Sequence, residues 1–185
     1  MATIPVNVFD LLQTTALGVF GMFASLLLNA FFSRRIALKY EVWARRSIGR
    51  KHYNRALYLF FLAVVSLAIV QVGAIVVWAI LLRVMNVVPD MLQALLFAGS
   101  CYTTVGILSD IAAEHWRLLP IFIAVSGIFS FALSTANVVS MAPLYRRAWF
   151  AKHAKHVRGL LVAEQLDPHE VGLAFLIEEE DDRRA

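Results

Sequence analysis

Four long stretches of the chain carry no charged side chain. They cover residues 11–33, 56–82, 91–109 and 118–145. About 20 consecutive apolar residues of helix are enough to cross the hydrocarbon core of a bilayer. On length alone, each of the four could span a membrane, and the pattern predicts an all-α membrane protein.

The third stretch is more polar than the others. It begins with apolar residues and then becomes rich in glycine and hydroxyl-bearing side chains between Gly99 and Gly106. Such a sequence has weak helix propensity and would expose backbone to lipid, which offers no hydrogen bonds. The composition therefore predicts a short helix followed by an extended loop that enters the bilayer and returns.

The basic residues decide the topology. One cluster lies within residues 34–55 and another within 146–158, whereas residues 1–10 contain no Lys or Arg and 83–117 contain only two. The positive-inside rule places both clusters in the cytoplasm, which requires the third stretch to return on its own side. The sequence predicts three spans and one re-entrant loop in the cell (inner) membrane, with the N-terminus outside and the C-terminus inside.

Composition narrows the class of protein. Of the 185 residues, 60% are hydrophobic and 16% are charged, whereas soluble domains are about 45–50% apolar and about 25% charged. The single cysteine excludes a disulfide framework. A signal peptide is not expected, because the first ten residues carry no cation. No nucleophile, general base or metal cluster indicates an enzyme, no cofactor is expected, and nothing indicates nucleic-acid binding.

The re-entrant segment has the chemistry of a cation site. A helix that ends within the membrane directs the partly negative end of its dipole there, which favours a cation. The following strand offers carbonyl oxygens, and Thr103 and Thr104 add hydroxyl oxygens. One strand cannot surround an ion, but four strands related by rotation can.

These residues resemble a known family. Cys101-Tyr102-Thr103-Thr104-Val105-Gly106, followed by Asp110, is similar to the potassium-channel filter signature Thr-Val-Gly-Tyr-Gly-Asp, which follows a pore helix. The flanking residues, from about Leu57 to Leu144, resemble small bacterial channels of the two-span superfamily that carry an extra N-terminal span. The resemblance implies a homotetramer, in which each copy supplies one pore loop.

The charge pattern and the resemblance together predict a domain organisation. The charges give a span (1–33), a basic cytoplasmic loop (34–55) and a cytoplasmic helical tail (145–185), and the resemblance implies a pore domain (56–144) between the loop and the tail. Within the pore domain it implies an outer helix (56–82), a pore helix (89–102), a filter (103–110) and an inner helix (117–144).

The filter departs from the family pattern after Gly106. Where the family has Tyr-Gly-Asp, this chain has Ile107, Leu108, Ser109 and Asp110. A residue with a side chain resists the positive φ that glycine allows, so the outer half of the filter must be rebuilt. The resemblance implies a selectivity filter for a monovalent cation, K⁺ or else Na⁺, formed by Thr103, Thr104, Val105, Gly106, Ile107, Leu108, Ser109 and Asp110.

Polar residues in the spans suggest further roles. Ser130, Ser134 and Asn137 share one face of the last span and either line a water-filled cavity or hydrogen-bond across helices; we favour the cavity. Gly127 permits either hinge motion or close packing. The predicted pore-lining residues are Gly127, Ser130, Ser134 and Asn137. For Asn29 and Gln71 we expect interhelical hydrogen bonds.

Two functions remain open. The first is a pore-forming subunit of a tetrameric cation channel, and the alternative is a non-conducting accessory or structural subunit of the same fold. Membrane lipid is an expected partner in both cases, with anionic lipid at the basic loop. In the tail, Asp167-Pro168-His169-Glu170 predicts a helix start, followed by an apolar stripe of Leu173, Leu176 and Ile177.

Overall fold

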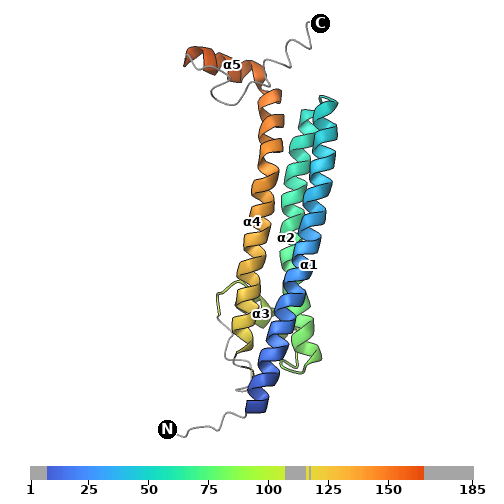
Figure 1. Cartoon of the computed structure of the whole chain (residues 1–185), viewed down its shortest axis with the longest axis vertical. Helices are drawn as coiled ribbons and strands as arrows, with labels where there is room; N and C mark the ends of the chain where they lie inside the picture. Colours follow the sequence, from blue (N-terminus) through green and yellow to red (C-terminus); the bar gives the residue numbers. More distant parts are fainter. Residues whose placement is uncertain (1–7, 107–115, 117, 165–185) are drawn as a thin grey trace. The chain divides into compact units, whose positions relative to one another are not determined.

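The computed structural model describes residues 8–106, 116 and 118–164 (Figure 1). Every element in this part of the chain is a helix. Three helices are long and apolar enough to cross a membrane. The predicted all-α architecture with three long apolar helices is therefore confirmed. The helices are α1 (Val8–Gly49), α2 (Tyr53–Val84), α3 (Met91–Tyr102), α4 (Leu119–Lys152) and α5 (Ala154–Ala163).

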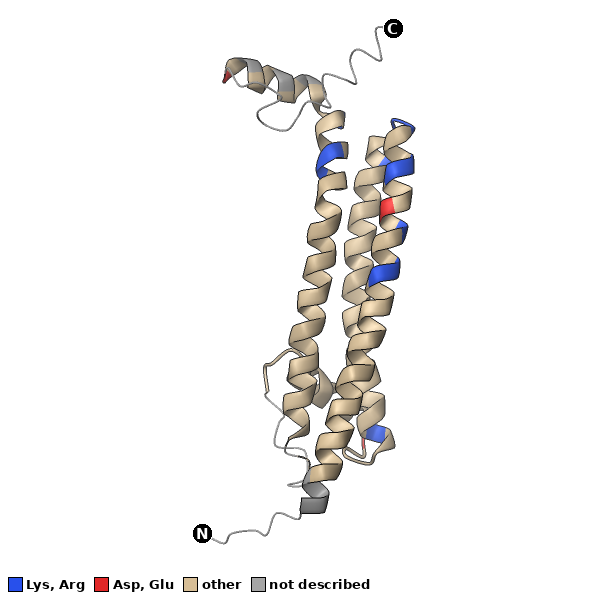
Figure 2. Cartoon of the chain, in the orientation of Figure 1, with Lys and Arg blue, Asp and Glu red and all other residues tan. Residues whose placement is uncertain are grey.

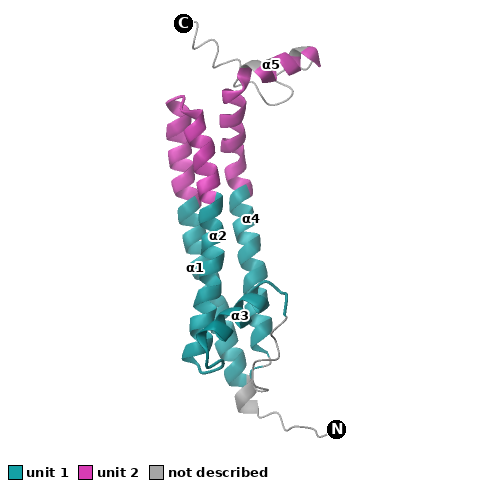
Figure 3. Ribbon diagram, turned by 180° about the vertical axis from the view of Figure 1, so that it is seen from behind, with its two compact units in different colours: residues 1–36, 64–138 teal, residues 37–63, 139–185 magenta. Residues whose placement is uncertain are grey.

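The chain forms two compact units (Figure 3). The first comprises residues 1–36 and 64–138, and the second comprises 37–63 and 139–185. We call them unit 1 and unit 2. Unit 1 contains α3 and the loop that follows it.

The basic segment 34–55 is helical over most of its length, because α1 continues to Gly49. The predicted loop is reduced to a turn at residues 50–52. Lys51 has a φ of 59°, and the amides of Lys51 and His52 donate to the carbonyls of Ile48 and Ser47, both at 2.9 Å. This bonding pattern is a Schellman motif, which closes the end of a helix.

Helix α2 ends in the same way, and α3 starts directly after it. Asn86 has a φ of 54°, and the Val87 amide donates to the Leu82 carbonyl at 3.0 Å. Asp90 is then the N-cap of α3, since its carboxylate accepts a hydrogen bond from the Gln93 amide at 3.0 Å. Helix α3 therefore starts at Met91, two residues after the predicted start, and Pro89 lies outside it.

The core of unit 1 is built around α3. Trp78, Phe97, Tyr102, Leu119 and Ile123 from α2, α3 and α4 are at most 1% exposed and belong to one cluster. The indole nitrogen of Trp78 also donates to the Ser126 hydroxyl at 2.9 Å. This packing fixes α3 against the two long helices that flank it in sequence.

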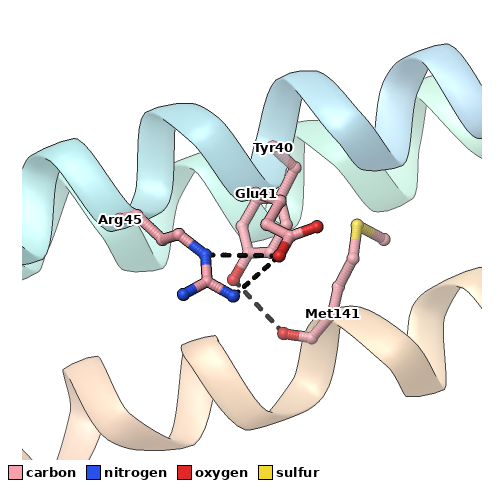
Figure 4. A network of polar contacts seen from close by, with 4 residues as sticks. All are labelled: Tyr40, Glu41, Arg45 and Met141. Carbon is pink, nitrogen blue, oxygen red and sulfur yellow. Dashed lines mark hydrogen bonds and ion pairs between the residues drawn. The ribbon is translucent and has the colours of Figure 1, made fainter.

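In unit 2, aromatic rings from α1, α2 and α4 pack against one another. Phe60 lies 5.9 Å from Tyr40 and 4.6 Å from Tyr145, measured between ring centroids. The Tyr40 hydroxyl donates to the Met141 carbonyl at 3.5 Å (Figure 4). Helix α4 continues through this unit to Lys152, eight residues past the predicted end at 144, and includes Pro143. The predicted helix start at Asp167–Glu170, with its apolar stripe, lies outside the described residues.

Candidate functional site

The loop after α3 closes over the end of that helix. The amides of Thr103, Thr104 and Gly106 donate to the carbonyls of Gly99, Cys101 and Ser100, at 3.0, 2.9 and 3.0 Å. The Thr104 hydroxyl donates a hydrogen bond to the Thr103 carbonyl, with an O–O distance of 2.6 Å. Among the residues that the structure describes, the three successive carbonyl oxygens of Thr104, Val105 and Gly106 have no backbone donor.

Two residues of this loop have left-handed torsions. Gly106 has a φ of 69°, which glycine adopts at no steric cost. Thr104 has a φ of 62°, and for a β-branched residue this is an outlier. Such strain concentrates at functional sites, where the surrounding structure holds it in place.

Burial changes abruptly where the loop begins. Cys101 and Tyr102 are 3% and 0% exposed, whereas Thr103 through Gly106 are all exposed. Val105, an apolar residue, is 59% exposed. The base of the loop is therefore anchored in the interior of unit 1, while the loop itself has no cover from the described residues.

Gln71 of α2 anchors the base. Its amide oxygen accepts hydrogen bonds from the Tyr102 hydroxyl at 2.7 Å and from Asn29 Nδ2 at 3.2 Å. Its amide nitrogen donates to the Ser134 hydroxyl and, at 2.9 Å, to the Ser130 carbonyl. Both acceptor positions and both donor positions of this buried amide are used.

The hydrogen bonds of Gln71 join all four helices of unit 1. Asn29 belongs to α1, Tyr102 to α3, and Ser130 and Ser134 to α4. On α1 the network extends to Ser33, whose hydroxyl donates to Asn29 Oδ1 at 3.2 Å. We call Ser33, Asn29, Gln71, Tyr102 and Ser134 the polar hub. The prediction that Asn29 and Gln71 form interhelical hydrogen bonds is confirmed.

The polar hub corrects the prediction of pore-lining residues on α4. Ser130 and Ser134 are 0% and 9% exposed, and the Ser130 carbonyl and the Ser134 hydroxyl both accept from Gln71 of α2. The alternative of hydrogen bonding across helices is therefore the correct one for Ser134. Asn137 is only partly buried, and its amide donates to the Leu133 carbonyl at 2.9 Å.

Gly127 also faces the interior of unit 1. A Cβ atom at this position would lie 2.0 Å from the Tyr102 carbonyl oxygen and 3.2 Å from the Tyr102 ring. The absence of a side chain thus lets α4 pack directly on the end of α3. Of the two roles considered for Gly127, the structure supports close packing.

The sequence reasoning missed the exposed face of α4. Ile128, Phe131 and Thr135 are exposed and lie three and four residues apart, on one side of the helix. The Phe131 ring lies 5.9 Å from that of Tyr102, so this side adjoins the base of the loop. Two of these three side chains are apolar, so a search for polar residues does not find this face. The signal in the sequence is their spacing of three and four residues.

The remaining predicted filter residues, Ile107, Leu108, Ser109 and Asp110, lie outside the described residues. The structure therefore describes only the inner half of the predicted filter, from Thr103 to Gly106.

Comparison with known proteins gives one match. Residues 64–142 match a protein family described as "Ion channel". No curated protein and no solved structure matches the chain. The matched segment contains most of α2, all of α3, the loop and most of α4. Together with the three long apolar helices, the match indicates a membrane protein with an ion-channel-like segment.

Proposed function

We propose that the chain is the pore-forming subunit of a tetrameric cation channel in the cell membrane. Each of four copies would contribute residues 103–110 to a shared filter around the symmetry axis. The observation that carries the proposal is the exposed loop within the segment that is similar to ion channels, where the carbonyls of Thr104, Val105 and Gly106 have no backbone donor among the described residues.

The electrostatics of α3 favour a cation at the loop. The last turn of α3 itself contains no basic residue, although the amides of Thr103, Thr104 and Gly106 already donate to the carbonyls of Gly99, Cys101 and Ser100. A helix terminus stabilises an ion of opposite charge by about 0.3–1 kcal/mol, and more where it is partly buried. Four such ends around one axis would act on the same ion.

The exposed loop supports a multi-subunit pore. One loop supplies too few oxygens to replace the hydration shell of K⁺ or Na⁺, whereas channel filters use rings of carbonyls from several subunits. Val105 is 59% exposed in the single chain, and neighbouring copies would cover it. The conduit below the filter would be lined by the exposed face of α4, at Ile128, Phe131 and Thr135, with Asn137 at its edge.

Selectivity depends on the second half of the filter. Ile107 and Leu108 replace the tyrosine and glycine expected after Gly106, and neither suits a positive φ. We therefore propose that the channel discriminates weakly between K⁺ and Na⁺. The N-terminus would lie outside and the basic segment 34–55 in the cytoplasm, following the charge distribution.

Ion flux into liposomes tests the proposal. Purified protein should conduct K⁺, with a smaller preference over Na⁺ than a channel with an intact signature. Gly106→Ala should reduce flux, because alanine resists the φ of 69°. Gly73→Ala is the matched control, since a Cβ atom there meets no atom within 4 Å.

The same experiment distinguishes a conducting channel from the alternative, a non-conducting subunit. If reconstituted protein carries neither ion under any condition tested, the channel proposal is wrong and a non-conducting accessory or structural subunit is favoured. The missing second glycine is the observation that favours this alternative. Equal loss of flux in Gly106→Ala and Gly73→Ala would show that the loop torsion has no part in conduction.

A further inference from the structure

The turn between α1 and α2 encloses a small cavity, separate from the loop after α3. Its volume is about 370 Å³, which is at the lower end of the roughly 300–1,000 Å³ typical of ligand pockets. All its lining residues belong to unit 2. They are Val42, Trp43, Arg46, Ser47, Arg50, His52 and Arg55.

The cavity is strongly positive. Three of its lining residues are arginines, and none is acidic. The one acidic residue within 34–55, Glu41, pairs instead with Arg45 at 2.7 Å (Figure 4). None of the three cavity arginines forms an ion pair with an acidic residue in the described ranges. Figure 2 shows the basic residues gathered on the second half of α1 and at this turn.

The helix ends at the turn add to this preference for an anion. Helix α2 starts at Tyr53 with no acidic residue in its first turn, so the partly positive end of its dipole is not neutralised. Helix α1 ends at the same turn, but carbonyls of its last residues accept the amides of Lys51 and His52. Arginine side chains present paired donors that match the oxygens of a phosphate group.

One wall of the cavity is apolar and open. Val42 and Trp43 are 62% and 54% exposed, and Leu38, one turn earlier on α1, is 51% exposed. Tryptophan is enriched where membrane meets water. A phosphate dissolved in water would gain nothing from such a wall, whereas the acyl chain of a phospholipid would be shielded from water along it.

We infer that this cavity is a binding site for an anionic phospholipid. Arg46, Arg50 and Arg55 hold the phosphate of the headgroup, and the glycerol and acyl chain lie against Val42 and Trp43. The site is more specific than the general attraction of a basic segment to an anionic membrane. It does not depend on whether the chain conducts ions.

Equilibrium binding of phosphatidylglycerol to the purified full chain in neutral detergent micelles tests the inference. Phosphatidylcholine serves as the neutral lipid. The cavity variant replaces Arg46, Arg50 and Arg55 by glutamine. Each cation near an anionic headgroup contributes roughly fivefold to affinity, so this variant should bind about 100-fold more weakly.

A matched control removes the same charge elsewhere on α1. It replaces Arg34, Arg35 and Lys39 by glutamine, and these residues do not line the cavity. The control should lose less than tenfold in affinity. Equal losses in the two variants would overturn the inference, because the attraction would then be a property of the whole segment.

Two further measurements test whether arginine geometry matters and whether the ligand is a lipid. Replacing the three cavity arginines by lysine preserves the charge that orients the chain, and it should still weaken binding several-fold because the paired donors are lost. Unchanged affinity in the lysine variant would argue against the site. Displacement of the lipid by millimolar inorganic phosphate would show that free phosphate, and not a lipid, is the ligand.

Discussion

Replacing Gln71 by leucine should destabilise unit 1 and disturb the loop that follows α3. The change keeps the apolar stem and removes four hydrogen bonds, to Asn29, Tyr102, Ser130 and Ser134. It also leaves three side chains of other helices without their partner in a region that we place within the membrane.

The expected loss in free energy of unfolding follows from the number of hydrogen bonds that are removed. Hydrogen bonds between membrane helices contribute on average about 0.6 kcal/mol each, with a maximum near 1.7 kcal/mol. Four of them give about 2.4 kcal/mol, so we expect Gln71→Leu to lower the free energy of unfolding by about 2–3 kcal/mol. Tyr102→Phe removes a single bond of 2.7 Å and should cost about 1 kcal/mol.

The assay is equilibrium unfolding in mixed micelles, followed by circular dichroism. Gln13→Leu is the matched control, because Gln13 is exposed on α1 and should tolerate leucine with little change. Since Tyr102 acts through Gln71, the double variant should be little less stable than Gln71→Leu alone. The reasoning is refuted if Gln71→Leu costs no more than Gln13→Leu, or if the two hub changes are additive.

A flux measurement separates positioning from stability. Tyr102 directly precedes the loop, so loss of its hydroxyl bond should alter the ratio of K⁺ to Na⁺ flux in protein that is still folded. A purely structural role would change the amount of folded protein and leave this ratio unchanged.

Three further changes test other parts of the structure. Gly127→Ala should cost about 1–3 kcal/mol of unfolding free energy, since its Cβ would lie 2.0 Å from the Tyr102 carbonyl oxygen, while Gly73→Ala should be neutral or stabilising in the same assay. Asp90→Ala should cost about 1 kcal/mol by removing the N-cap of α3, and Asp90→Ser should restore most of it. Replacing residues 107–109 by Tyr-Gly should raise the K⁺ to Na⁺ flux ratio; no change would show that the outer filter does not limit selectivity.

The sequence was sufficient to predict the three long apolar helices, because charge-free stretches mark them and polar composition sets the fourth such stretch, 91–109, apart. It did not predict how far α1 extends. Lysine, arginine and glutamate interrupt the apolar stretch after residue 33, yet they are good helix formers, and Glu41 and Arg45 pair one turn apart. Hydropathy measures the length that lipid covers, and it does not measure the length of the helix.

The orientation of α4 could not be predicted from its own sequence. The helical period correctly places Ser130 and Ser134 on one face, but their polarity suits both a wet conduit and a buried hydrogen bond. The choice depends on Gln71, which lies 59 and 63 residues earlier in the chain. A contact over that separation cannot be read from local periodicity. The polarity of two serines therefore indicated the wrong side of the helix.

The contact between Gly127 and Tyr102 has a mechanical consequence. With no side chain between α4 and the last carbonyl of α3, there is no compressible layer to absorb a displacement of one helix relative to the other. If α4 tilts or slides at this level, it must push the peptide that begins the loop, only one residue before Thr103. A force applied to α4 would therefore reach the loop through direct backbone contact, over a distance of a single peptide.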